Sequence, residues 1–250
     1  MTPPAVGTPT TRRGIPSRRT RRGTLSIAMD AEHRAPSLRA VRRAAAVLAT
    51  AAALAFSGGP ARAGGGPLGI DAVQPLRDHG LWDPDLQRAA YYALIVGPWI
   101  GALVEGTETR IGRTWWRSAE SATASLVAVT AVKSIAQRRR PNQADPPDPD
   151  LWRQGSEYEA FPSGHVTLAT AAVAPFIMEY GRDRPEVWAL AAIPFWMGLA
   201  RINVQAHWQT DVLGGWALGL ATAWLATKPD SPLVLRVFGD GGFVGLRYRW

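Results

Sequence analysis

The sequence contains no cysteine among its 250 residues, and this absence removes several kinds of chemistry at once. Without thiols the chain has no disulfide framework, no thiolate zinc site and no cysteine nucleophile. The length is still sufficient for one or two domains with a buried core.

Acidic residues are scarce at the start of the chain. Residues 1–63 contain 11 of the 28 Lys and Arg residues but only two of the 20 acidic ones, Asp30 and Glu32. The remaining 187 residues carry 17 basic and 18 acidic groups, so the formal charge of +8 comes from this first part. A body that binds nucleic acid needs a strongly basic face. We therefore expect no nucleic-acid partner.

Within this basic part, residues 34–63 have the three-part order of a secretory signal. Arginines come first, an apolar stretch follows over residues 44–56, and Ala61 and Ala63 supply the small residues that precede a cleavage site. We expect the whole leader to direct export to the cell envelope, with Met29 as an alternative start of the chain. The other interpretation is an uncleaved membrane helix, although these 13 apolar residues fall short of the ~20 that a span needs.

Long hydrophobic runs are also missing from the rest of the chain. Asp83 followed by Pro84 is typical of a helix start. Five helices are expected, at residues 89–104, 118–136, 166–180, 187–202 and 212–227. The uncharged cores of the last four are 12 to 16 residues long and mostly apolar on all sides. Such helices form either the interior of a bundle or short membrane spans.

The sequence contains evidence for and against a membrane location. If the helices cross in alternation, the basic residues between them fall on one common side, as the positive-inside rule requires. Every apolar run is nevertheless shorter than ~20 residues, and the mean hydropathy is only −0.08. We therefore expect an all-α fold, a helical bundle of five to six mostly apolar helices that sits at a membrane surface or partly in it.

The helical domain spans residues 87–228 in this interpretation. A lead-in segment over residues 64–86 precedes it, and residues 229–250 form a tail. Two apolar runs flank the glycine-rich residues 239–242 of this tail, which predicts a short β-hairpin. A proline-rich loop over residues 138–160 interrupts the helices, and a loop of this length in a compact domain is often functional.

Three clusters of polar residues stand out against the apolar helices. They are Lys133 with Arg140, Ser163 with Gly164 and His165, and Arg201 with His207 and Asp211. The clusters use rare residues, because they contain one of the two lysines of the chain and two of the three histidines that follow the leader.

The second and third clusters contain groups that bind anions and transfer protons. Ser163 and Gly164 lie where a loop enters a helix, so that free backbone N–H groups and the positive helix end create an anion site. His165 at its rim can exchange a proton near neutral pH. His207 and Asp211 are four residues apart and share a face of a helix, so the carboxylate can hold one ring nitrogen while the other acts as a nucleophile.

The cationic residues complete this set. Arg140 and Arg201 offer planar donor forks for phosphoryl oxygens, and Lys133 offers a point charge. Each cluster alone is more often a solvated helix end, a helix cap or a surface pair, but together they supply what phosphoryl transfer needs when no metal takes part. The two histidines are 42 residues apart, which lacks the paired spacing of helical zinc ligands. We expect neither a metal nor a cofactor.

In their order and spacing, the three clusters resemble the three-part signature of the type 2 phosphatidic acid phosphatase and vanadium haloperoxidase superfamily. The resemblance covers about residues 87–228. One position departs from the pattern, because the family usually has serine immediately before the arginine of the third cluster and this chain has Ala200. This change bears on the positioning of Arg201 more than on the chemistry.

The resemblance implies a role for each motif residue. His207 attacks phosphorus to form a phosphohistidine, Asp211 orients it, and His165 protonates the leaving oxygen and then activates water. The phosphoryl oxygens are held by the remaining motif residues, Lys133, Arg140, Ser163, Gly164 and Arg201.

These implications lead to a metal-independent phosphatase that acts on a phosphomonoester or pyrophosphate, with a membrane lipid as its substrate. We expect it in the periplasm or on the cytoplasmic membrane, with the active site facing outward. The alternatives are a soluble periplasmic acid phosphatase with small substrates, a haloperoxidase with vanadate as its cofactor, and a binding protein without catalysis.

Overall fold

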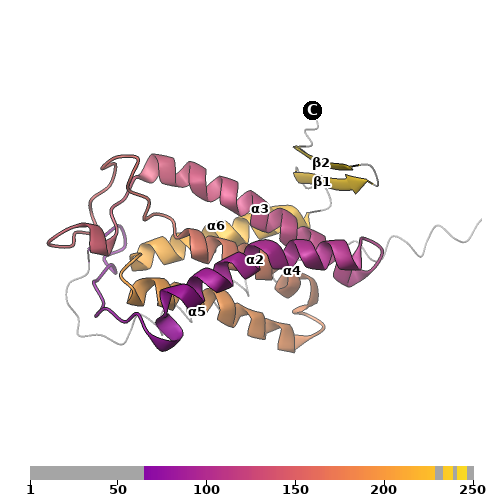
Figure 1. The fold of residues 1–250 in the computed structure, drawn as a ribbon, viewed down its shortest axis with the longest axis horizontal. Coiled ribbons are helices and arrows are strands. Elements are labelled where there is room, and N and C mark those ends of the chain that lie inside the picture. The colour runs from indigo at the N-terminus through magenta and orange to yellow at the C-terminus, as the bar shows by residue number, and fades with distance from the viewer. Residues whose placement is uncertain (1–64, 229–232, 239–240, 247–250) are drawn as a thin grey trace, which may run out of the picture. The chain divides into compact units, whose positions relative to one another are not determined.

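The structure is a computed structural model that describes residues 65–228 and the backbone of residues 233–238 and 241–246. It is mostly helical, so the expected fold class is confirmed in this respect (Figure 1). The described residues form five α-helices: α2 (Pro84–Glu105), α3 (Arg110–Ala136), α4 (Gly164–Tyr180), α5 (Ala192–Asn203) and α6 (Gln209–Thr227). The predicted leader and the turn of the predicted tail hairpin lie outside the described residues.

Shorter elements connect and follow these helices. Three 3₁₀ helices are present: η1 (Gly80–Trp82), η2 (Pro141–Gln143) and η3 (Pro185–Ala191). Two strands near the C-terminus, β1 (Leu233–Phe238) and β2 (Gly241–Leu246), pair antiparallel. None of the helices in the described ranges has both the length and the hydropathy needed to cross a membrane.

The starts of α2 and α3 are set by capping side chains. As expected, α2 begins at Pro84, with Asp83 as its N-cap accepting the Asp85 N–H at 2.7 Å. Helix α3 begins at Arg110, eight residues before the expected start. Thr109 caps it by accepting a backbone N–H of the first turn at 2.9 Å. This cap allows the helix to start among charged residues, which the apolar pattern does not mark.

The prediction of a single helix at residues 187–202 is wrong, because the structure divides this segment into η3 and α5. Pro194 lies in the first turn of α5. It has no N–H to donate to the Leu190 carbonyl four residues earlier, and its ring crowds that carbonyl. The segment before it therefore takes a 3₁₀ form.

Helix α4 lies at the centre of the helical part and packs against α2, α3, α5 and α6. Most of its residues are buried. One core cluster joins α4, α5 and α6 through Val166, Ala169, Met197, Ile202, Val212 and Trp216. This cluster lies directly behind the N-terminal turns of α4 and α6, and it holds those two helix ends together.

Two glycines of α6 allow the backbones of α4 and α6 to approach closely. A Cβ at Gly215 would lie 2.9 Å from the Ser163 carbonyl oxygen, and one at Gly219 would lie 2.5 Å from the Thr167 carbonyl oxygen. At the N-terminal end of this contact, the Ser163 N–H donates to the Asp211 carbonyl at 2.9 Å. The small residues thus bring the start of α4 beside the first turn of α6.

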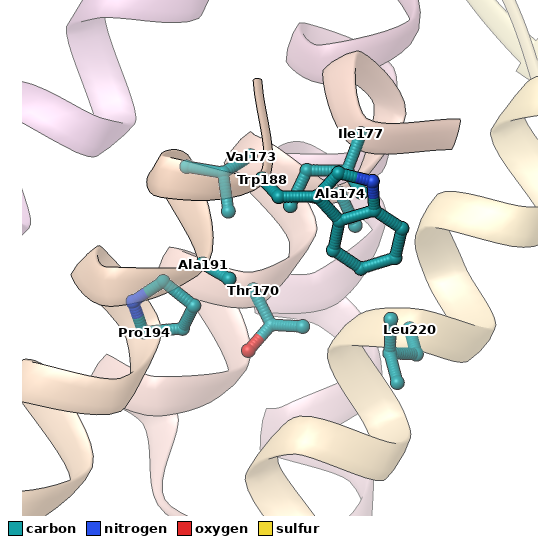
Figure 2. Close-up of a pocket in the computed structure, with 8 residues that line it drawn as sticks. All are labelled: Thr170, Val173, Ala174, Ile177, Trp188, Ala191, Pro194 and Leu220. Carbon is teal, nitrogen blue, oxygen red and sulfur yellow. The ribbon is translucent and has the colours of Figure 1, made fainter. Parts of the chain in front are cut away.

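A small apolar cavity lies between α4, η3, α5 and α6 (Figure 2). Its walls are formed by Thr170, Val173, Ala174, Ile177, Trp188, Ala191, Pro194 and Leu220. Thr170 Oγ1 donates to the Val166 carbonyl and Trp188 Nε1 to the Gly181 carbonyl. The cavity measures about 10 Å³, which is room for one water at most. It is a packing gap and not a ligand site.

Candidate active site

A larger cavity, of about 330 Å³, is lined by charged, polar and apolar residues from α2, α3, α4 and α5 and from the loops that follow α3 and α5. Six of the eight residues singled out in the sequence line this cavity: Lys133, Arg140, Gly164, His165, Arg201 and His207. The other two, Ser163 and Asp211, are buried next to it. The tertiary structure therefore brings the three sequence clusters to one place.

Three cations face this cavity, and few groups balance their charge. Burial, and then the neighbouring Arg140, lower the pKa of Arg201 to about 10. Burial is also the main cause that lowers the pKa of Lys133, whose Nζ lies 3.6 Å from the Glu159 carboxylate. The Nε atoms of Arg140 and Arg201 are buried without a hydrogen-bond partner among the described residues. The cavity is therefore suited to an anion.

The N-terminus of α4 forms another wall. Ser163 is the N-cap, but its hydroxyl does not cap the helix; Oγ is buried and has no partner in the part of the chain that the structure describes. A Cβ at Gly164 would lie 3.9 Å from Nζ of Lys133, so the absent side chain leaves the space between the helix end and this ammonium open. Free N–H groups of a first helical turn favour an anion in such a space.

His207 and Asp211 meet, but not on a shared helix face as expected. His207 lies in the turn before Trp208, the N-cap residue of α6. Asp211 turns back toward it, because its Oδ2 accepts the Trp208 N–H at 2.8 Å. The same oxygen is 3.5 Å from Nδ1 of His207, which is longer than a hydrogen bond. A helix-capping turn, and not helical spacing, brings the two side chains together.

Burial controls the charge of this pair. Burial first, and then Arg201 and Arg140, lower the pKa of His207 well below its ordinary value, so the ring is neutral. Burial raises the pKa of Asp211 to about 6, against the opposing effect of Arg138. A neutral ring that carries its proton on Nδ1, on the side of the carboxylate, leaves a free lone pair on Nε2. This is the form that a nucleophilic histidine needs.

His165 is the second residue of α4, and its ring lies against Tyr91 of α2 with centroids 4.4 Å apart. Burial, followed by Arg201 and His207, lowers the pKa of His165 to about 3. The ring is therefore neutral at pH 7. A bound anion would raise this pKa, because it would offset the surrounding positive charge. The sequence did not indicate Tyr91, since one aromatic residue in an apolar helix has no distinguishing pattern.

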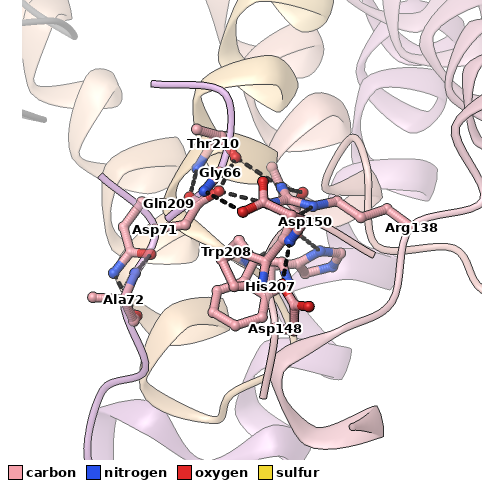
Figure 3. A network of polar contacts seen from close by, with 12 residues as sticks. Gly66, Asp71, Ala72, Arg138, Asp148, Asp150, His207, Trp208, Gln209 and Thr210 are labelled. Atoms are coloured by element: carbon pink, nitrogen blue, oxygen red, sulfur yellow. Dashed lines mark hydrogen bonds and ion pairs between the residues drawn. The ribbon is translucent and has the colours of Figure 1, made fainter. Parts of the chain in front are cut away.

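Two further charged residues belong to the site and were not predicted. Arg138 is the first of three consecutive arginines at residues 138–140, and its side chain is completely buried. It donates to Asp211 Oδ1 at 2.6 Å. It also donates to Asp71 at 2.5 Å (Figure 3). Asp71 comes from the lead-in segment, 67 residues earlier in the chain. No local pattern could have paired the two.

Gln87 is the third residue that sequence reasoning missed. It is fully buried on α2, and its Oε1 accepts from Nη1 of Arg201 at 3.1 Å. Its Nε2 donates to the Trp82 carbonyl at 2.7 Å, which fixes the amide. The side chain of Gln87 thus positions Arg201, next to the place where Ala200 replaces the usual serine of the family pattern.

The cavity offers anion-binding groups rather than metal ligands. Within the described residues, no three His, Asp or Glu side chains are grouped so that they could hold a metal ion. The expectation that the activity needs no metal and no cofactor stays a prediction.

Comparisons with known proteins bear on the same part of the chain. The family model of the PAP2 superfamily matches residues 114–230. The chain is 36% identical over 96 residues to the lipid A 1-phosphatase of Rhizobium etli, an alignment that covers 33% of this chain and 40% of that protein. It is 39% identical over 71 residues to the lipid A 1-phosphatase of Rhizobium johnstonii, covering 28% and 27% of the two chains.

A third relative is the lipid A 1-phosphatase of Porphyromonas gingivalis, 36% identical over 73 residues that cover 28% of this chain and 16% of that protein. The alignments therefore span less than half the length of each of these three relatives. No solved structure matches the chain at comparable significance.

Proposed function

Because the chain belongs to the PAP2 superfamily through residues 114–230, we propose that it is a phosphatase that hydrolyses a phosphate ester of a membrane lipid through a phosphohistidine. One observation carries this proposal: three cations, the N-terminus of α4 and two neutral histidines surround a single space of about 330 Å³. Catalysis of phosphoryl transfer is mostly positioning and charge stabilisation, and these groups supply both.

The first task of the site is to hold the phosphoryl oxygens. Arg140 and Arg201 have buried Nε–H groups that find no partner in the described part of the chain, and both present planar forks that fit two oxygens at once. Lys133 adds a positive charge when the phosphate displaces Glu159 from it. The free N–H groups at the start of α4 and the Ser163 hydroxyl complete the cradle. Charge that develops on these oxygens in the transition state is stabilised in place.

The first chemical step is attack by His207. Its Nε2 lone pair forms a bond to phosphorus while the bond from phosphorus to the leaving oxygen breaks. Binding of the phosphate dianion raises the pKa of His165, so the ring takes up a proton. His165 gives this proton to the leaving oxygen, so the alcohol leaves neutral. Asp211 stabilises the positive charge that develops on the His207 ring. Atoms and charge balance without another reactant.

The second step releases phosphate with water. His165, now neutral, accepts a proton from a water molecule as the water oxygen attacks phosphorus. The bond from phosphorus to His207 breaks, and the nitrogen recovers its lone pair. His165 ends the cycle protonated, as it began. One residue thus acts as acid and then as base, as the reversal of the first step requires.

An apolar surface beside the cavity favours a lipid substrate over a small one. Helix α2, which contributes Tyr91 to the cavity wall, exposes a row of apolar side chains: Tyr92, Val96, Ile100, Leu103 and Val104. Helix α3, which contributes Lys133, exposes Val127 and Ile135. The cavity volume is at the small end for ligand sites. It takes a phosphate head, and the rest of the substrate lies outside, against a surface that suits acyl chains.

The named relatives make one lipid phosphate the first to test. They are lipid A 1-phosphatases, and a lipid A phosphate would leave its apolar chains outside the cavity. The proposal includes export, an outward-facing site at the membrane surface, and activity without a divalent metal because the cationic side chains take its place.

The test is phosphate release by the full-length protein in detergent. The panel contains phosphatidate, a polyprenyl pyrophosphate, a lipid A phosphate and simple sugar phosphates. We expect release from a detergent-dispersed lipid phosphate and none from the His207→Asn variant. Release from sugar phosphates alone would favour a soluble acid phosphatase. Halide oxidation that depends on peroxide and vanadate would favour a haloperoxidase, and no release from any substrate would contradict the proposal.

Two surface variants test whether the exposed apolar row on α2 binds the lipid substrate. Val96→Ser and Ile100→Ser remove apolar area from the exposed row on α2 without touching the cavity. They should raise the KM for the lipid phosphate and leave turnover of a soluble phosphate ester unchanged. Equal effects on both substrates would count against a lipid-binding surface.

A further inference from the structure

We propose that Arg138, anchored by Asp71, is a positioning residue that keeps the Asp211 carboxylate ionised and turned toward His207. The inference rests on the proposed function, in which His207 is the nucleophile. Neither Arg138 nor Asp71 lines the cavity. Asp71 also lies outside the part of the chain that the PAP2 family model matches. A segment that precedes the helices thereby helps to position a residue of the site.

Arg138 has no freedom of orientation. Its Nη1 donates to Asp211 Oδ1 at 2.6 Å and to Thr210 Oγ1 at 2.7 Å. Its Nε and Nη2 donate to the Pro149 carbonyl at 3.0 and 2.6 Å. The guanidinium also lies over the Trp152 ring, 4.3 Å from its centroid. Every side of this cation is held by the protein, so it contributes its charge at one defined place.

Asp71 fixes the far side of Arg138 and joins the lead-in segment to the start of α6. Its Oδ1 accepts the Thr210 N–H at 2.8 Å, and its Oδ2 accepts from the Thr210 hydroxyl at 2.6 Å and from Arg138 (Figure 3). The next residue, Ala72, exchanges two hydrogen bonds with the Gln209 side chain, at 3.0 and 2.9 Å. The lead-in segment is therefore clamped onto the first turn of the helix that carries Asp211.

This arrangement gives the two oxygens of Asp211 different partners. Oδ1 accepts from Arg138, while Oδ2 accepts from the Trp208 N–H at 2.8 Å and faces Nδ1 of His207 at 3.5 Å. With Oδ1 held, the carboxylate cannot rotate away from the imidazole. An ionised Oδ2 fixes the proton of the neutral ring on Nδ1, which leaves Nε2 free to attack phosphorus.

Arg138 also opposes the protonation of Asp211. Burial raises the pKa of this carboxyl to about 6, and Arg138 is the largest opposing influence, ahead of the Trp208 N–H and the more distant Arg140. The other charged or titratable groups that face it are His207, which is neutral, and Asp71 on the far side of Arg138. Loss of the guanidinium charge would raise the pKa further and leave Asp211 protonated at neutral pH.

A purely structural role for Arg138 predicts a different result. If the residue only ties the lead-in segment to α6, its replacement should lower activity by the same factor at every pH. If it positions and ionises Asp211, its replacement should shift the acidic limb of the kcat profile to higher pH. It should also lower kcat and leave KM unchanged, because Arg138 does not touch the cavity.

The experiment measures kcat and KM against pH for full-length Arg138→Gln and Arg138→Lys, with Arg139→Gln as the matched control. Arg139 is the neighbouring arginine, and its guanidinium lies over the Tyr158 ring instead of the network. The pKa of Asp211 is about 6, and for Arg138→Gln we expect the acidic limb to move up by about two pH units. Such a shift lowers kcat at pH 7 by about tenfold, and the loss is recovered at higher pH. Arg138→Lys keeps the charge and should keep the limb, with a lower kcat. Arg139→Gln should match the unchanged protein.

A titration that needs no turnover separates this inference from the proposed function. The carboxyl of Asp211 is followed by ¹³C NMR, with its signal assigned through Asp211→Asn. The pKa of Asp211 should be higher in Arg138→Gln than in the unchanged protein. An unchanged pKa, or an equal loss of kcat at every pH, would overturn the inference even in an active phosphatase. If the unchanged protein releases no phosphate, the proposed function fails, and the titration still decides the role of Arg138.

Asp71→Asn provides the second test and keeps the shape of the side chain. Thermal unfolding and circular dichroism establish which variants fold. If Arg138→Gln does not fold, kcat and KM of Arg138→Lys and Asp71→Asn test the inference instead. Both should lower kcat without changing KM, because the guanidinium fork or its anchor is lost. A folded Asp71→Asn or Arg138→Lys with full kcat would overturn the inference.

Discussion

Binding of a dianion in the cavity should raise the pKa of His165 and protonate its ring. Burial, Arg201 and His207 lower the pKa of this ring from 6.5 to about 3. A general acid must carry a proton at the pH where the enzyme works. The mechanism therefore requires that the substrate itself raises the pKa of His165, and this requirement can be measured without any chemistry.

The magnitudes support this expectation. A shift from 6.5 to about 3 corresponds to a penalty of roughly 5 kcal/mol against the charged ring. A dianion ~4 Å from the ring attracts an imidazolium by about 8 kcal/mol at an effective dielectric constant of about 20. The attraction exceeds the penalty. The pKa of His165 should therefore rise to neutral pH or above when the anion is bound, and the ring should take up a proton.

Calorimetric titration with sulfate measures this uptake. Sulfate remains a dianion over the whole range, whereas phosphate would itself lose protons to the cationic site. The binding enthalpy is measured at pH 7 in two buffers with different ionisation enthalpies, and the difference gives the number of protons taken up. His165→Gln is the matched variant, because it subtracts protons taken up by other groups. The unchanged protein should take up about one proton more than the variant. Equal proton uptake by the two proteins would refute the reasoning.

The two histidines should differ as catalysts, and His207→Asn should lose all turnover and form no phosphoenzyme. His165→Gln should lower the turnover rate with an alkyl phosphate by ~10²–10⁴-fold. The same variant should keep a burst with p-nitrophenyl phosphate, whose leaving group needs no proton. Equal losses in rapid-quench experiments would contradict the assigned roles. Gly219→Ala places a methyl 2.5 Å from a carbonyl oxygen of α4 and should lower the free energy of unfolding by about 1–3 kcal/mol. Gly97→Ala, inside α2, meets nothing within 4 Å and should raise the free energy of unfolding by about 0.5–1 kcal/mol, because alanine favours a helix over glycine. Denaturant titrations that rank the two variants in the opposite order would be inconsistent with the close helix contact. Gln87→Leu removes the acceptor that holds Arg201 and should raise KM about tenfold, the equivalent of one hydrogen bond to a charged group. Gln87→Glu keeps the acceptor and should keep KM. Steady-state kinetics with an unchanged KM for the leucine variant would argue against this role. Activity should persist in EDTA, and a loss that magnesium restores would show that a metal takes part.

The helices show how far local patterns determine the fold. Asp83 and Pro84 mark the start of α2 because capping involves only neighbouring backbone groups, and the apolar cores predicted where α4 and α6 lie. The division into η3 and α5 was missed, although Pro194 is visible in the sequence. Pro194 lies in the interior of the expected helix at residues 187–202, where a proline interrupts the helix. The division is therefore a local property of the chain that the apolar pattern concealed.

The sequence by itself determined which residue types are available for chemistry and how they are grouped. The spacing within each cluster, such as Lys133 with Arg140, is a property of the chain and could be recognised before any fold was known. The tertiary structure alone decided that these clusters line one cavity, that Arg138 is enclosed rather than solvated, and that Asp71 lies beside it. Burial and charge depend on groups brought together from distant parts of the chain. Protonation states and positioning contacts therefore exist only in the folded protein.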